Sequence, residues 1–146
     1  MITDFWVNLP VKDINRSKEF FASLGFNFRP LPDNREDSAC LVLGNRNVSV
    51  MLFEEPLFKS FSDFEITDTS KNTEVLFSID AGNVEEVNNL ALKVKDAGGE
   101  VFSEPAEKDG WMYGCGFTDP DGHRWSVLYM DVSKMQKHQK TELQVP

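Results

Sequence analysis

The sequence has few cysteines, few histidines and fewer basic than acidic residues. Cys40 and Cys115 do not form a CxxC pair, so we expect two reduced thiols rather than a disulfide. The net charge of −9 argues against nucleic acid and anionic membranes as partners, because both attract a basic face. No apolar run approaches the roughly 18 residues that a membrane helix needs. The opening segment MITDFWVNLP lacks the basic and apolar regions of a signal peptide, which favours a cytoplasmic location.

What the chain does contain is enough apolar material for a core. Its 146 residues suit one domain, or two small halves that share an interior. Apolar residues make up 40% of the sequence and include twelve phenylalanines and three tryptophans. We therefore expect a globular protein.

The first half of the chain shows one strand, one helix and three further strands. Alternation of apolar and polar residues over 4–11 predicts a half-buried strand. Apolar residues at helical spacing follow, between a capping Asp13 and a stop at Gly25. Further strands are predicted over 27–30, 38–44 and 47–55, with a hairpin turn at 44–47.

The same order of elements recurs in the second half. A strand over 73–80 precedes a helix that starts after Asn83 and stops at Gly98, and three strands follow over 100–105, 110–117 and 123–131. Such self-similarity indicates two copies of one βαβββ unit, each with a helix on one face of its sheet. The helix residues expected to be buried are Phe20, Phe21, Leu24, Val87, Leu90 and Val94.

Two segments lie outside this repeat. Residues 56–72 contain phenylalanines at spacing three (Phe58, Phe61 and Phe64), which predicts a short amphipathic helix that either packs into the core or forms a lid over a ligand. The polar tail 132–146 is expected to be solvated, with His138 exposed. The predicted organisation is a domain over 1–131, with modules at about 1–55 and 73–131, a linker at 56–72 and the tail.

The two modules, the opening VNLPVKDINRSKEFFASLGF and the closing DPDGHRWSVLYMD together resemble the vicinal oxygen chelate superfamily over residues 1–131. This superfamily includes glyoxalase I, bleomycin-resistance proteins, fosfomycin-resistance enzymes and extradiol dioxygenases. The resemblance implies an α+β fold of two βαβββ modules whose curved sheets enclose a cleft, with the helices on the outer faces. It also favours a homodimer, because open sheets leave edges to be covered.

The resemblance further places the superfamily's metal ligands at four positions, and most of these hold poor donors here. The first falls at Trp6, whose indole N–H donates and has no lone pair to offer. The position four residues after the glycine of DPDG holds Ser126, and the equivalent strand of the first module offers Ser49 and Met51. Only Glu74 is a usual ligand, so we expect no cofactor. A divalent metal held by Glu74 is the alternative.

Several residues are candidates for binding a small molecule in the cleft. The Asn8 amide can orient a polar ligand, Trp6 and Trp111 can form stacking walls, and Gly114 with Gly116 either widens the cleft or allows a close backbone approach. The implied ligand-binding set is Trp6, Asn8, Ser49, Met51, Trp111, Gly114, Gly116 and Ser126. Glu74 is the one candidate catalytic base, against the alternative of a solvated residue at a strand start. Structural roles for Asn8 and for the tryptophans stay open.

His123 follows the DPDG turn, and strand geometry argues against a chemical role for it. Consecutive strand residues point to opposite faces, so His123 cannot share a face with Ser126. We expect a type I turn that shapes a hairpin, with His123 at the strand end.

Two functions are compatible with these residues. The first is a metal-free protein that binds a small, aromatic or cationic molecule, as bleomycin-resistance proteins do. The second is a divergent metal-dependent lyase, isomerase or dioxygenase of the same superfamily, since one fold can support several activities.

Overall fold

The computed structural model describes residues 1–137, which form two compact units. Unit 1 consists of Met1–Thr73 together with the turn Pro120–Gly122. Unit 2 consists of Glu74–Asp119 and the chain from His123 onward. Within residues 1–137, no helix combines the length and the apolar character needed to cross a membrane. His138 and most of the predicted tail lie outside the described residues.

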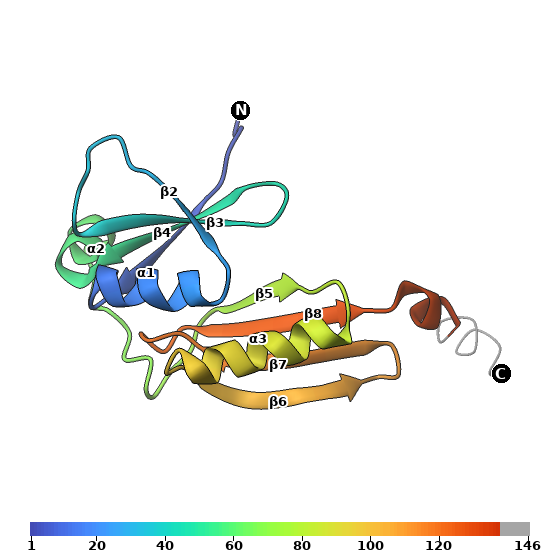
Figure 1. Cartoon of the computed structure of the whole chain (residues 1–146). Helices are drawn as coiled ribbons and strands as arrows, with labels where there is room; N and C mark the ends of the chain where they lie inside the picture. Colours follow the sequence, from blue (N-terminus) through green and yellow to red (C-terminus); the bar gives the residue numbers. More distant parts are fainter. Residues whose placement is uncertain (138–146) are drawn as a thin grey trace. The chain divides into compact units, whose positions relative to one another are not determined.

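Unit 1 has the predicted β-α-β-β-β order, followed by one more helix (Figure 1). Its elements are β1 (Val7–Val11), α1 (Ile14–Ser23), β2 (Asn27–Arg29), β3 (Ser38–Leu43), β4 (Val48–Glu54) and α2 (Glu55–Ser62). The strands form one sheet in the order β1-β4-β3-β2, in which β1 and β4 are parallel and the other pairs are antiparallel. Helix α1 packs against β2, β3 and β4.

Unit 2 repeats this topology. Its elements are β5 (Leu76–Asp80), α3 (Val84–Asp96), β6 (Glu100–Lys108), β7 (Met112–Thr118) and β8 (Arg124–Met130). The sheet order is β5-β8-β7-β6, again with one parallel pair, β5 and β8. Helix α3 packs against β6, β7 and β8, as Figure 1 shows. The predicted α+β fold of two βαβββ modules is confirmed. Residues 132–137 continue as a short helical segment after β8.

The helices bury the stripes that their spacing predicts. Helix α1 buries Phe20 and Phe21, and Leu24, which directly follows this helix, is also buried. Helix α3 buries Val87 and Val94. Leu90 is only half-buried. Both helices begin at the predicted caps, because the Asp13 carboxylate accepts from the Asn15 and Arg16 N–H groups and Asn83 accepts from the Glu86 N–H.

The linker helix departs from one of its two predicted roles. Helix α2 has no buried residue, and Phe61 and Phe64 are 64% and 79% exposed. The prediction that these two rings pack into the core is therefore wrong. The Phe61 ring contacts the Phe53 ring edge-on, with centroids 5.2 Å apart. Phe64 lies beyond Asp63, where a left-handed backbone ends the helix and removes Phe64 from the helical stripe. The lid role of this segment stays a prediction.

The core of unit 2 centres on Trp125. Its side chain is fully buried, its ring lies parallel to that of Phe117 at 6.1 Å, and the Phe77 ring is 4.9 Å away. The indole nitrogen donates to Asp119 Oδ2 at 3.2 Å. This buried carboxylate also accepts from the His123 backbone N–H at 3.0 Å. His123 therefore stands at the strand end, next to a carboxylate that closes the β7–β8 hairpin.

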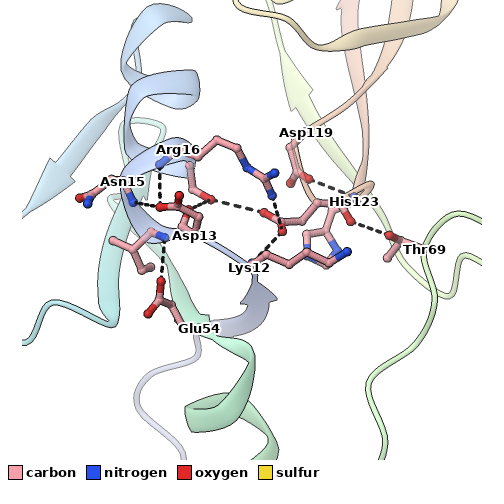
Figure 2. Close-up of polar contacts among 11 residues, drawn as sticks. Lys12, Asp13, Asn15, Arg16, Glu54, Thr69, Asp119 and His123 are labelled. Carbon is pink, nitrogen blue, oxygen red and sulfur yellow. Dashed lines mark hydrogen bonds and ion pairs between the residues drawn. The ribbon is translucent and has the colours of Figure 1, made fainter.

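The DPDG turn has a second role, within unit 1. The Asp121 side chain is 5% exposed and accepts from the Lys12 backbone N–H at 2.8 Å and from Arg16 Nη2 at 3.0 Å (Figure 2). Its other oxygen accepts from the Ser17 hydroxyl at 3.4 Å. Glu54 accepts from the Ile14 N–H, so carboxylates surround the first turn of α1. This arrangement satisfies N–H groups that a helix start leaves without intrahelical partners.

Candidate functional site

The face of the unit 1 sheet opposite α1 gathers part of the predicted site. Because alternate strand residues share a face, Leu9, Leu52 and Leu41 point toward α1, while Asn8, Ser49 and Met51 point the other way. A cavity of about 310 Å³ lies on this second face. Its lining includes three predicted residues, Trp6, Ser49 and Met51. Asn8 shares the face but does not line the cavity.

This cavity combines apolar walls with the acidic Asp4 and with one pair of polar side chains, Arg29 and Ser49. Trp6 is 53% exposed and supplies an indole surface, and Pro30, Leu31 and Pro32 add apolar lining from the loop after β2. Arg29 Nη1 lies 3.5 Å from Ser49 Oγ, a long hydrogen bond from a guanidinium to a hydroxyl. Such a site suits a small organic molecule with an apolar body and a few polar groups.

Sequence reasoning missed Arg29. Its strand, β2, has three residues, and its face follows only from the pairing of Arg29 with Cys40, which places both side chains on the cavity face. The one local pattern that could have drawn attention to this segment is RPLP, because Pro30 and Pro32 restrict the backbone of the loop that lines the cavity.

In unit 2, three predicted residues share the face of the sheet opposite α3. Gly116 pairs with Ser126, and Gly114 pairs with Leu128 on the same face. A side chain at Gly116 would collide with the Phe102 ring, and one at Gly114 would collide with the Val127 carbonyl oxygen. The two glycines thus permit close packing at this face.

Arg124 also lies on this face of unit 2, and its guanidinium carbon is 4.5 Å from the centroid of the Phe102 ring. Arg124 is half-buried, and the ring beneath it is 40% exposed. A guanidinium over an aromatic face leaves its N–H groups directed sideways, where they can donate to a polar ligand.

The remaining predictions fall elsewhere. Glu74 is exposed, in the bend before β5, at the first residue of unit 2. Trp111 lies in the turn between β6 and β7, away from the face of Gly114, Gly116 and Ser126.

Within residues 1–137, no three His, Cys, Asp or Glu side chains are grouped so that they could hold a metal ion. Cys40 and Cys115 are both buried and are not joined in a disulfide, and burial raises the pKa of the Cys115 thiol.

Comparisons with known proteins agree with the fold of the two units. Residues 4–44 match the family profile described as bleomycin resistance protein-like N-terminal. The hypothetical protein SA1046 from S. aureus is 34% identical, with 88% of this chain and 94% of that chain covered and a TM-score of 0.79. A glyoxalase-related enzyme from Fulvimarina pelagi superposes with a TM-score of 0.73 over 87% of this chain and 88% of that chain, at 16% identity. The chain belongs to the vicinal oxygen chelate superfamily.

A further neighbour in this superfamily is the fosfomycin resistance protein FosX from Listeria monocytogenes. It is 16% identical, covers 94% of this chain and 98% of its own, and has a TM-score of 0.68. FosX has been crystallised with Mn(II) and sulfate. At this identity the likeness concerns the fold alone. A comparison with curated proteins found no significant match.

Proposed function

We propose that this protein binds a small organic molecule in the unit 1 cavity and does so without a metal ion. The observation that carries the proposal is the grouping of Trp6, Arg29, Ser49 and Met51 around a cavity of about 310 Å³. That volume lies at the lower end of the range of roughly 300–1,000 Å³ for ligand pockets. The ligand is therefore expected to be small.

Different lining residues are expected to contact the apolar and the polar parts of the ligand. The indole of Trp6 presents a flat apolar surface on which a planar or aliphatic body can stack. Arg29 holds five N–H donors in a rigid fork, and its weak contact with Ser49 is readily exchanged for a ligand oxygen. A ligand with an oxygen-rich end and an apolar body fits this pattern best.

The donor chemistry at the positions implied by the superfamily supports binding without metal. Trp6 has no lone pair for a cation, and Ser126 and Ser49 are uncharged hydroxyls that compensate poorly for lost hydration. Glu74 is a usual ligand, but a single exposed carboxylate holds a divalent ion weakly, since stable sites combine about three or more protein ligands. These residues do not fit the metal centre of the superfamily's enzymes.

The second candidate is a divergent metal-dependent enzyme of the superfamily. The fold likeness to FosX, which has been crystallised with Mn(II), favours it. The two candidates differ in what a chelator does: ligand affinity is unchanged by chelator in the first and is lost in the second.

The test is a ligand screen by thermal shift, followed by calorimetric titration of hits in the presence of a chelator. Trp6→Ala is expected to weaken binding roughly three- to tenfold, because a stacking contact contributes about 0.5–1.5 kcal/mol. Arg29→Gln should weaken oxygen-rich hits, and Trp6→Phe should retain most of the affinity.

The matched control is Leu92→Ala, which removes an exposed apolar side chain from α3 in the other unit. It is expected to leave ligand affinity unchanged. Hits whose affinity is indifferent to both Trp6→Ala and Arg29→Gln would refute the proposed site.

A further inference from the structure

Unit 2 contains a second cavity, of about 220 Å³, which the proposed function does not use. Three aromatic side chains, Trp111, Tyr113 and Tyr129, line it together with the acidic Glu107 and Asp131. All three aromatic residues are half-buried. Trp111 thus lies beside Tyr113 and Tyr129, and not beside Gly114, Gly116 and Ser126 of the predicted ligand set.

Strand register explains why these residues meet. Tyr113 pairs with Tyr129 across β7 and β8, and with Glu107 across β6 and β7, so the three share one face of the sheet. The Asp131 N–H donates to the Trp111 carbonyl at 2.8 Å, which continues the same pairing beyond the strand ends. The face is the one that α3 covers.

The cavity lies beside the N-terminal end of α3. The helix begins at Val84, which also lines the cavity, and the Tyr113 hydroxyl donates to Asn88 Oδ1 in its second turn at 2.7 Å. This bond fixes the Tyr113 side chain against the helix.

The charge around the rings is mainly negative. Glu107 and Asp131 both line the cavity, and Lys134 is the single basic residue of the lining among the described residues. Asp131 accepts hydrogen bonds from the Ser133 hydroxyl and from the Ser133 and Lys134 N–H groups, and these bonds lower the pKa of its carboxyl. Glu85 and Glu86 occupy the adjacent first turn of α3.

We propose that Trp111, Tyr113 and Tyr129, with Glu107 and Asp131, form a binding site for a small organic cation of the alkylammonium class. Aromatic faces carry negative electrostatic potential and attract cations, and quaternary ammonium groups are recognised by clusters of such rings. The two carboxylates supply the complementary charge. The cavity is too small for a drug-sized ligand and large enough for one methylated ammonium group.

The test titrates the full-length protein with choline chloride and observes the indole N–H resonances by NMR. The neutral isostere 3,3-dimethylbutan-1-ol has the same shape without the charge. Saturable binding of choline is expected below about 50 mM, with the isostere at least about fivefold weaker, and Trp111→Leu is expected to weaken choline binding about tenfold. Trp111→Tyr should restore part of it, which separates loss of the ring from loss of folding.

Two further variants test the effect of charge at the cavity and the specificity of the Trp111 effect. Lys134→Gln removes the competing ammonium and is expected to strengthen choline binding about twofold, a gain that a damaged fold would not give. Leu92→Ala removes an exposed side chain of α3 that does not line this cavity, and it is expected to leave choline affinity unchanged. Equal affinity for choline and its isostere, or choline binding indifferent to Trp111→Leu, would overturn the proposal.

Discussion

Trp125→Ala is expected to cost about 4 kcal/mol of stability, the largest effect that we predict for a single substitution. The side chain is fully buried, and its ring contacts Phe77 and Phe117. Its removal leaves a large cavity in the middle of the unit 2 core. It also takes one donor from the buried Asp119 carboxylate, which adds to the loss. The measurement is urea unfolding followed by circular dichroism, which does not depend on Trp125 as a fluorophore.

Two controls separate these contributions. Trp125→Phe keeps a ring between Phe77 and Phe117 and removes the indole donor, so we expect a loss of about 2 kcal/mol. Leu92→Ala removes a side chain that is 58% exposed and should change stability by less than about 0.5 kcal/mol. A Trp125→Ala variant as stable as Leu92→Ala would contradict the described core.

The second large effect is expected at the DPDG turn. Asp121→Ala should cost about 2–3 kcal/mol, because it leaves the Lys12 N–H and the Arg16 guanidinium without the carboxylate that accepts from both. Arg16 is 45% exposed, so most of the effect is expected from the Lys12 N–H and from the start of α1. Thermal unfolding of the variant and the wild type measures the difference.

The expected pattern at Asp121 is graded. Asp121→Asn keeps an acceptor for the Lys12 N–H and should cost about half as much as the alanine variant. Arg16→Ala removes only the half-exposed partner and should cost less than about 1 kcal/mol. If Arg16→Ala were as damaging as Asp121→Ala, the ion pair rather than the backbone bond would carry the stability of this turn.

Local signals were sufficient to predict the fold. The caps Asp13 and Asn83 and the stop at Gly25 are contiguous with the helices they bound, and each helix has a 3.6-residue apolar period. The β8 strand alternates as expected, with Trp125 and Val127 buried on one face. Phe5 is the exception: the predicted strand over 4–11 includes it, but β1 begins only at Val7 and Phe5 is 74% exposed.

The functional residues were less accessible to sequence reasoning, because their grouping depends on contacts between distant segments. Trp6, Ser49 and Met51 came from a resemblance combined with strand parity. Arg29 joins them through the register of a three-residue strand. Asp121 contacts Lys12 and Arg16 across more than a hundred residues of sequence, which no local pattern reports. The homodimer and the cytoplasmic location stay predictions.

The most direct test of the central claim, that a small molecule is bound without metal, is the metal content of the purified protein. Elemental analysis after gel filtration is predicted to find far less than one equivalent of Zn, Ni or Mn per chain. Added equimolar metal should then raise the melting temperature little, because stabilisation follows RT ln(1 + [L]/Kd) and a single exposed Glu74 binds weakly. One tightly held equivalent that Glu74→Ala removes would contradict the account and favour the metal-dependent enzyme.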